Sequence, residues 1–160
     1  MKLKIFTTGG TIDKIYFDAK NDYQVGEPEI ESLLSEANVT FDYTVESLLR
    51  KDSLEMTEAD RKLVHDAVAA EPCSRILITH GTDTMLATGK SLLDIADKTI
   101  VLTGSMQPAR LRVSDAFFNV GFAVAAVQLL SSGVYVVMNG QVFDPRTSRK
   151  NVEKNCFERL

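Results

Sequence analysis

Four short runs of β-branched and aliphatic residues, each followed within two residues by a glycine, constrain the fold of this chain most strongly. They are Leu3–Thr7, Arg75–Thr79, Thr99–Thr103 and Val134–Met138. A run of this kind predicts a strand that is buried on both faces, and the glycine predicts the turn that ends it. We expect a further strand at Val39–Val45.

Segments with the apolar spacing of helices lie between the predicted strands. They are Glu29–Glu36, Thr57–Ala70, Thr84–Ile95 and Ser114–Leu130. Thr57 and Asp60 form a helix-start signal, because the threonine hydroxyl accepts a backbone N–H and the acid favours the positive end of the helix dipole. Buried strands joined by helices form a parallel sheet with right-handed crossovers. We therefore predict a three-layer α/β/α domain with a mainly parallel, flavodoxin-like sheet.

Length and composition suit a single domain over residues 1–160. Of the 160 residues, 44% are hydrophobic, which is enough to bury a core without disulfides. The net charge of −4 provides no large positive field that would hold nucleic acid. Cys73, Cys156, His65 and His80 lack the spacing of metal ligands, so we expect no metal and two reduced thiols.

The sequence predicts a soluble, cytoplasmic protein with no membrane partner. The first residues, MKLKIF, lead directly into a strand-like run and lack a secretory signal. The longest mainly apolar segment, Val113–Leu130, is interrupted by polar residues and is short for a membrane span. Two stretches are expected to be irregular. Asp13–Glu27 is predicted to be a loop or mobile flap, and the basic run Arg146–Lys150 a solvated loop.

Two segments rich in glycine and threonine follow predicted strands. TTGGT occupies Thr7–Thr11, and HGTDT occupies His80–Thr84. Ligands of open α/β sheets bind at the carboxyl ends of the strands, so we expect both segments to face one pocket. A threonine hydroxyl needs a nearby base or cation to act as a nucleophile, and backbone N–H groups in glycine turns can stabilise an oxyanion.

Both segments also allow simpler interpretations. TTGGT is compatible with an ordinary strand-to-helix turn or a phosphate cradle, and in HGTDT either Thr82 or Asp83 is a possible helix cap. We expect His80 to hold its turn by hydrogen bonding rather than to act as a base. The three methionines of the second half are expected to be packing residues: Met85, Met106 and Met138.

Five segments, taken together, resemble the bacterial L-asparaginase family. They are TTGGTID at Thr7–Asp13, HGTDTM at His80–Met85, VLTGSMQPAR at Val101–Arg110, SDAFFN at Ser114–Asn119 and VVMNGQVFDPRTSRK at Val136–Lys150. Their order and spacing agree over most of the chain. The resemblance implies the fold of the asparaginase N-terminal domain. It also implies an amidohydrolase that converts L-asparagine to L-aspartate and ammonia through a threonine acyl-enzyme, without a cofactor.

The resemblance implies catalytic roles for five residues. Thr11 falls on the usual nucleophile, and Tyr23 falls on the loop tyrosine that assists proton transfer. Thr82, Asp83 and Lys150 fall on a triad. In this triad Lys150 helps to deprotonate a hydroxyl or a water molecule, Thr82 positions or delivers it, and Asp83 orients Lys150. Whether Thr11 or Thr82 attacks first is left open.

The resemblance also implies a set of substrate-binding residues. Ser53 falls on the serine that holds the α-carboxylate, and Asp83 is a further contact for the amino group. The full set is Gly10, Ser53, Leu54, Glu55, Gly81, Thr82, Asp83 and Ser105.

Three features depart from the family pattern. Leu54 stands where relatives often have a polar residue, and Asp13 and Lys14 stand where many have small residues. The chain ends at Leu160, before the C-terminal domain that supplies an acid to a neighbouring subunit's site in the family. We expect Glu55 or another subunit to replace that acid, and we expect a homo-oligomer. The alternatives are a weakly active amino-acid-binding or regulatory module, and an amidase for glutamine or another small amide.

Overall fold

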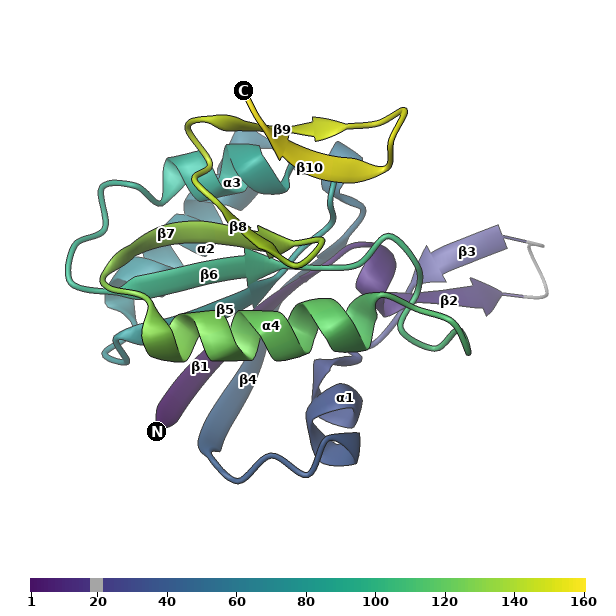
Figure 1. Cartoon of the computed structure of the whole chain (residues 1–160), viewed down its shortest axis with the longest axis horizontal. Helices are drawn as coiled ribbons and strands as arrows, with labels where there is room; N and C mark the ends of the chain where they lie inside the picture. Colours follow the sequence, from purple (N-terminus) through teal and green to yellow (C-terminus); the bar gives the residue numbers. More distant parts are fainter. Residues whose placement is uncertain (18–21) are drawn as a thin grey trace.

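A six-stranded sheet with the order β4-β1-β5-β6-β7-β8 forms the centre of the molecule (Figure 1). The computed structural model describes residues 1–17 and 22–160. The strands of this sheet are β1 (Lys2–Gly9), β4 (Asp42–Lys51), β5 (Arg75–Thr79), β6 (Thr99–Thr103), β7 (Gly133–Met138) and β8 (Gln141–Phe143). Neighbouring strands from β4 to β7 are parallel, and β8 is antiparallel to β7. The predicted, mainly parallel α/β architecture is therefore confirmed.

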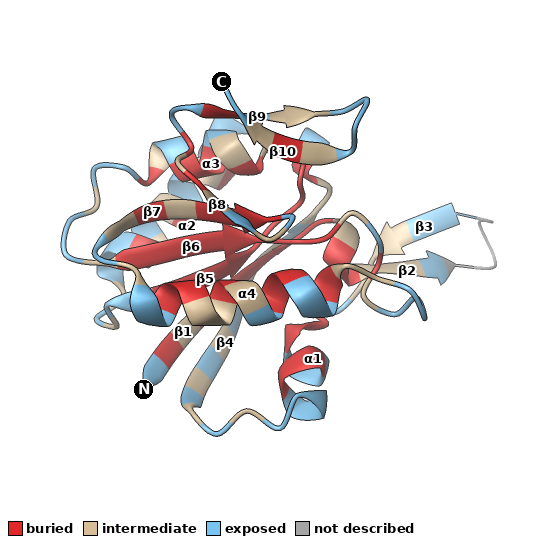
Figure 2. Cartoon of the chain, in the orientation of Figure 1, coloured by how far each residue is buried: buried red, intermediate tan, exposed pale blue. Residues whose placement is uncertain are grey.

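Helices cover both faces of the sheet, as predicted (Figure 1). They are α1 (Ile30–Glu36), α2 (Glu58–Ala70), α3 (Met85–Ser91) and α4 (Ala116–Leu129). Alternate side chains of β5 supply two separate cores. Ile76 and Ile78 pack in the cluster that contains residues of α2 and α3, whereas Leu77 packs in the cluster that contains residues of α1 and α4. Burial on both faces explains why the interior of this strand, Ile76–Ile78, is apolar (Figure 2).

The helix boundaries follow from local signals in two cases. Thr57 caps α2 in a capping box with Asp60, which confirms the predicted start signal. Helix α3 begins after Thr84, which has no side-chain cap bond, so neither Thr82 nor Asp83 is the cap. This helix ends at Ser91, short of the predicted Ile95. Leu92 and Ile95 still pack in the core, so the apolar pattern continues beyond the hydrogen-bonded helix.

Helix α4 is apolar around most of its circumference and contains no charged residue. Its inner side packs on the sheet through residues such as Ala123 and Val127, and its outer side exposes Phe117, Phe118 and Leu129. No helix in the part of the chain that the structure describes has both the length and the hydropathy needed to cross a membrane.

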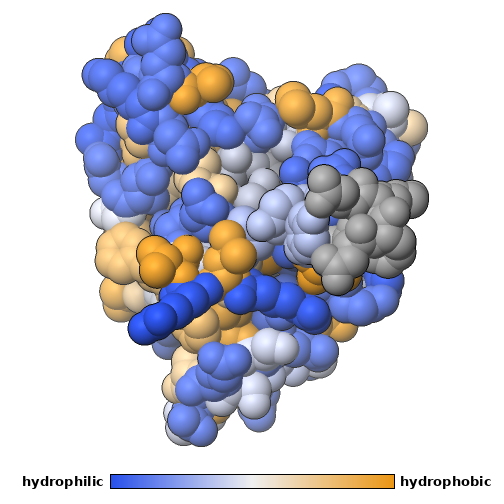
Figure 3. All heavy atoms as spheres, turned by 90° about the vertical axis from the view of Figure 1, so that its right-hand side faces the viewer, coloured by the Kyte–Doolittle hydropathy of each residue, from blue (hydrophilic) through white to orange (hydrophobic). Residues whose placement is uncertain are grey.

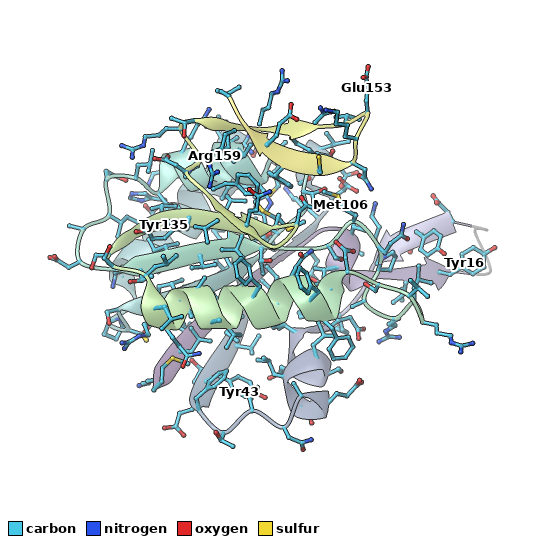
Figure 4. The ribbon with its side chains drawn as sticks, viewed as in Figure 1. Tyr16, Tyr43, Met106, Tyr135, Glu153 and Arg159 are labelled. Atoms are coloured by element: carbon cyan, nitrogen blue, oxygen red, sulfur yellow. The ribbon has the colours of Figure 1, made fainter. Side chains whose placement is uncertain are left out.

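The predicted loop over Asp13–Glu27 is wrong, because most of it forms a β-hairpin. Strands β2 (Lys14–Phe17) and β3 (Asp22–Val25) pair antiparallel, and the rings of Tyr16 and Tyr23 lie 5.5 Å apart, edge to face. Tyr16 projects near the outer end of this hairpin (Figure 4). The remaining part of the predicted loop, residues 18–21, lies outside the described residues. Each strand of the hairpin has only four residues, so its sequence signal is weak.

The predicted solvated loop at Arg146–Lys150 is also wrong in part. Strand β9 (Ser148–Asn151) begins inside it and pairs antiparallel with β10 (Cys156–Arg159). Ordinary sequence patterns miss this hairpin because its exposed positions are charged.

Two further strands differ from expectation. Strand β8 follows a turn in which Asn139 and Gly140 both have positive φ, the conformation of a tight hairpin. The Asn-Gly pair is therefore a hairpin signal rather than only a strand end. Strand β4 lies later than the predicted Val39–Val45, because it pairs along the whole of β1, from Lys2 opposite Asp42 to Gly9 opposite Lys51.

Candidate active site

The two glycine turns predicted to share a pocket are in direct contact. They follow β1 and β5, which are neighbours in the sheet with Thr7 opposite Thr79. A Cβ atom on Gly10 would lie 2.4 Å from the backbone nitrogen of Gly81, so no side chain fits there. Gly10 also has φ +93°, a conformation that favours glycine. Thr11 and Thr82 therefore follow two turns that touch each other.

Lys150 joins this site from the far end of the chain. Its Nζ lies 2.8 Å from Oγ1 of Thr82 and 2.7 Å from Oδ1 of Asp83. The lysine side chain is only 13% exposed, Thr82 is buried, and the side chain of Asp83 is 37% exposed. The three residues that the resemblance groups as a triad therefore lie within hydrogen-bond distance. A charged lysine donates to both oxygens, and a neutral amine can accept the hydroxyl proton of Thr82.

The β9–β10 hairpin carries Lys150 to the site. Phe157 pairs with Lys150 across the hairpin, so the two side chains lie on the same face. Phe157 is buried with its ring 6.0 Å from that of Phe143, and its N–H donates to Oδ1 of Asn139 at 2.9 Å. These contacts fasten the hairpin to the sheet. Glu153, in the turn of the same hairpin, points away from the body of the protein (Figure 4).

Ser53 offers an unused hydroxyl beside the second glycine turn. It is buried at the start of a 3₁₀ helix, η3 (Ser53–Glu55), and its Oγ has no hydrogen-bond partner among the described residues. A Cβ on Gly81 would lie 2.6 Å from this oxygen. Thr84 donates its hydroxyl to the carbonyl of Ser53 at 2.7 Å. A buried hydroxyl with no partner carries a desolvation cost, which a bound ligand can remove.

The β2–β3 hairpin and the end of β4 enclose a cavity of about 310 Å³ close to η3. Tyr23 and Glu55 both line it, together with Lys14, Gln24, Val25, Arg50 and Asp52. Tyr23 is 44% exposed, and Glu55 is also exposed. Figure 3 shows this edge of the molecule, where hydrophilic side chains predominate and apolar ones lie in separate patches.

The remaining predicted site residues lie in different environments. Thr11 is half-buried in a 3₁₀ turn, η1 (Thr11–Asp13). Leu54 is 73% exposed and points to solvent. Ser105 is fully buried, and its hydroxyl donates to the carbonyl of Gln107. The Ser105 hydroxyl therefore already donates a hydrogen bond within its own loop.

Comparison with known proteins shows the family of this chain. The family model for the asparaginase N-terminal domain matches residues 2–158. This chain belongs to the asparaginase family. Asparaginase relatives include the glutaminase-asparaginase of Acinetobacter glutaminasificans, with 31% identity over 96% of this chain and 51% of the relative. L-asparaginase 2 of Escherichia coli is 34% identical over 92% of this chain and 46% of the relative. The chain therefore spans about half the length of these relatives.

Another relative and two solved structures extend the comparison. A glutamyl-tRNA(Gln) amidotransferase subunit of Methanococcus vannielii is 29% identical over 89% of this chain and 35% of the relative. The thermostable L-asparaginase from Thermococcus kodakarensis superposes with a TM-score of 0.82 at 26% identity, over all of this chain and 51% of that one. A probable cytoplasmic L-asparaginase from Campylobacter jejuni gives 0.79 at 28% identity, over 99% and 51%.

His80 holds the turn of the HGTDTM segment through hydrogen bonds of its imidazole ring. Its Nδ1 lies 2.7 Å from the carbonyl oxygen of Gly81, and its Nε2 lies 2.8 Å from Oγ1 of Thr88. A carbonyl only accepts, so Nδ1 carries the proton and Nε2 accepts from Thr88. Complete burial lowers the pKa of His80 to about 4. The imidazole is therefore neutral at pH 7 and both nitrogens are occupied, as expected for a structural residue.

The other groups weighed from the sequence have packing or surface roles. Met85 and Met138 are buried in the core, and Met106 packs against it. Cys73 and Cys156 are free thiols. Within residues 1–17 and 22–160, no cluster of three His, Cys, Asp or Glu side chains is arranged to hold a metal ion.

Sequence reasoning missed two residues that support the candidate site, Asp52 and Asn139. Asp52 caps η3 by accepting the Leu54 N–H at 3.1 Å. An aspartate directly before Ser53 was the available signal, since aspartate is a preferred cap. Asn139 anchors the hairpin of Lys150 through a partner 18 residues away, which no local pattern reveals.

Proposed function

We propose that this chain hydrolyses L-asparagine to L-aspartate and ammonia through a threonine acyl-enzyme. The observation that carries the proposal is the contact of Lys150 with Thr82 and Asp83, at 2.8 and 2.7 Å, on the turn that touches Gly10. A threonine nucleophile requires a group that removes its proton. An amine beside a hydroxyl and a carboxylate supplies such a group next to the turn that carries Thr11.

In the first step, Oγ1 of Thr11 forms a bond to the side-chain amide carbon of asparagine. Its proton passes by way of Tyr23 or the Thr82–Lys150 pair to the amide nitrogen, which leaves as ammonia. In the second step, a water oxygen attacks the resulting ester with Lys150 taking its proton. Aspartate leaves and Thr11 regains its proton. Backbone N–H groups of the two glycine turns stabilise the oxyanion in both steps.

Polar groups around the turns match the two ends of the amino-acid substrate. We propose that the unpartnered hydroxyl of Ser53 binds the α-carboxylate. Asp83 and Glu55 then bind the α-amino group, because both are acids at the edge of the site. In this scheme, Glu55 is an acid that the chain itself contributes to the binding of the amino group.

Ammonia release from L-asparagine by the purified protein tests the function. Thr11→Ala and Thr82→Ala are each expected to lower kcat/KM by about 1,000-fold or more, because each removes a hydroxyl on the reaction path. Thr40→Ala, at an exposed threonine, is the matched control and is expected to change turnover little. Full turnover in Thr11→Ala with none in Thr82→Ala would assign the nucleophile to Thr82. Binding of asparagine without ammonia release would instead indicate a binding module.

Glutamine is the second candidate substrate, because several relatives are glutaminase-asparaginases. One additional methylene changes the free energy of transition-state binding by about 1 to 3 kcal/mol in a typical pocket. The ratio of kcat/KM for asparagine and glutamine, measured under the same conditions, decides between them. We expect asparagine to be preferred, and a ratio in favour of glutamine would reassign the substrate.

We further propose that the protein acts as a homo-oligomer in the cytoplasm. The uncharged outer face of α4, with Phe118 62% and Leu129 83% exposed, supports association of identical chains. The probable cytoplasmic L-asparaginase among the similar structures supports the location. Sedimentation analysis of the purified protein and fractionation of cells that produce it test the two statements separately.

A further inference from the structure

An ion pair joins the base of the β2–β3 hairpin to the turn that carries Ser53. Nζ of Lys14 lies 2.7 Å from Oδ2 of Asp52, and the two side chains are 25% and 29% exposed. Lys14 begins β2 three residues after Thr11, and Asp52 directly precedes Ser53. The pair therefore connects the segments that carry two of the proposed site residues.

Asp52 is fixed at its own end of the pair. Its Oδ1 accepts the Leu54 N–H at 3.1 Å while Oδ2 faces Lys14, so the carboxylate caps η3 and binds the hairpin at once. Burial raises the pKa of Asp52, but the contacts with Lys14 and Leu54 and the positive charge of Lys150 outweigh it and hold the pKa below its ordinary value. The carboxylate is therefore charged at neutral pH.

The ion pair spans the two walls of the 310 Å³ cavity. Lys14 and Tyr23 belong to the hairpin wall, whereas Asp52 and Glu55 belong to the wall formed by the end of β4 and η3. The distance between Tyr23 and Glu55 consequently depends on how closely Lys14 approaches Asp52.

A second ion pair near the same hairpin provides a comparison. Arg50 pairs with Glu27, but these side chains are 50% and 70% exposed. Exposed pairs contribute little because water and salt screen them, whereas partly buried pairs are screened less. The Lys14–Asp52 pair is therefore the stronger of these two ion pairs.

We propose that Lys14 and Asp52 form a latch that closes the β2–β3 hairpin against the Ser53 turn. By closing it, the two residues position Tyr23 and Glu55 on opposite sides of a small zwitterionic amide. Lys14 and Asp52 are positioning residues and do not take part in bond making. The substrate part of this inference rests on the proposed function, whereas the latch itself does not.

Amide hydrogen exchange of β2 and β3 tests the latch without reference to activity. Lys14→Met removes the charge, and Asp52→Asn removes it while keeping an oxygen for the Leu54 N–H. Each variant is expected to exchange about 5- to 30-fold faster in the hairpin than the wild type. Lys14→Arg keeps the charge and is expected to restore slow exchange. Glu27→Gln breaks the exposed pair and is expected to change exchange by less than about twofold.

Kinetics test the positioning role. Lys14→Met and Asp52→Asn are expected to raise the KM for asparagine about three- to tenfold while kcat stays within about threefold. The double variant is expected to be no worse than either single variant, because one interaction has been lost. Should the wild type release no ammonia, the dissociation constant of L-aspartate replaces KM.

The outcomes separate the latch from the proposed function. Unchanged hairpin exchange in both charge-removing variants overturns the latch, whatever the activity. Faster exchange with unchanged KM or aspartate affinity overturns the positioning role. Absence of ammonia release by the wild type, combined with faster exchange in both variants, overturns the proposed function and leaves the latch standing.

Discussion

Asp13 is a buried carboxyl two residues after Thr11, and its environment makes folding depend on pH. Burial raises its pKa to about 6, aided by the nearby charge of Glu29 and opposed by the Glu29 N–H and by Arg50. The folded state therefore holds this proton more tightly than the unfolded chain does. Between about pH 4 and pH 6, this group lowers the free energy of unfolding as pH rises, by about 3 kcal/mol in total.

We expect Asp13→Asn to remove this contribution, because asparagine carries no charge yet keeps an oxygen for the Glu29 N–H. Urea unfolding should then show a variant more stable than the wild type by about 1 to 3 kcal/mol at pH 7.5 and nearly equal to it at pH 3.5. Glu153→Gln, at an exposed acid in a turn, is the control. Equal stability of Asp13→Asn and wild type at both pH values would refute the assignment.

Lys150 is the single residue on which the proposed chemistry depends most. Lys150→Met keeps the length of the side chain but removes the amine that contacts Thr82 and Asp83. We expect kcat/KM for asparagine to fall by about 100-fold or more, with the free energy of unfolding changed by no more than about 1 kcal/mol. Lys154→Met, at an exposed lysine of the same hairpin, should retain activity. Retained activity in Lys150→Met would remove this lysine from the mechanism.

Among the elements, the β9–β10 hairpin links stability to the site. Phe157 is 2% exposed and packs on Phe143, opposite Lys150 in the hairpin. Phe157→Ala is expected to lower the free energy of unfolding by about 3 kcal/mol, because it leaves a cavity. Activity should also fall at temperatures where the variant remains folded, since Lys150 loses its support. Calorimetry and ammonia release measure the two effects.

Val152→Ala, at a side chain 74% exposed in the same hairpin, is the control for Phe157→Ala. It should change neither stability nor activity appreciably. If Phe157→Ala is destabilised yet fully active when folded, the position of Lys150 is set by the Thr82 and Asp83 contacts alone.

On the scale of the whole molecule, the outer face of α4 is expected to govern association. Phe118→Glu places a charge on a surface that must be desolvated when two copies meet, so we expect the oligomer to dissociate. Sedimentation velocity should show a shift to a smaller species, while Val152→Glu, on the distant hairpin, leaves the oligomer intact. Unchanged sedimentation of Phe118→Glu would place the interface on another surface.

Strands β5 and β6 were predictable to the residue, and the Lys150 hairpin was not. In β5 and β6 every interior position is apolar because both faces are covered, and a glycine marks the end of each. In β9 and β10 the side chains are mostly polar, because only Ser148 and Phe157 are buried there and Phe157 is the apolar anchor. A pattern of burial is visible in a sequence only when several residues share it.

The sequence by itself determined the parallel α/β sheet and the two glycine turns, together with the residue types at the site. Those features depend on local periodicity and on backbone conformations that only glycine adopts readily. The resemblance to the asparaginase family already grouped Lys150 with Thr82, 68 residues earlier. Only the tertiary structure decided that the β9–β10 hairpin carries Lys150 there, and that Lys14 lies against Asp52. Such contacts depend on how separately formed elements pack. The residue types of a short segment do not indicate which partner lies beside it once the core has formed.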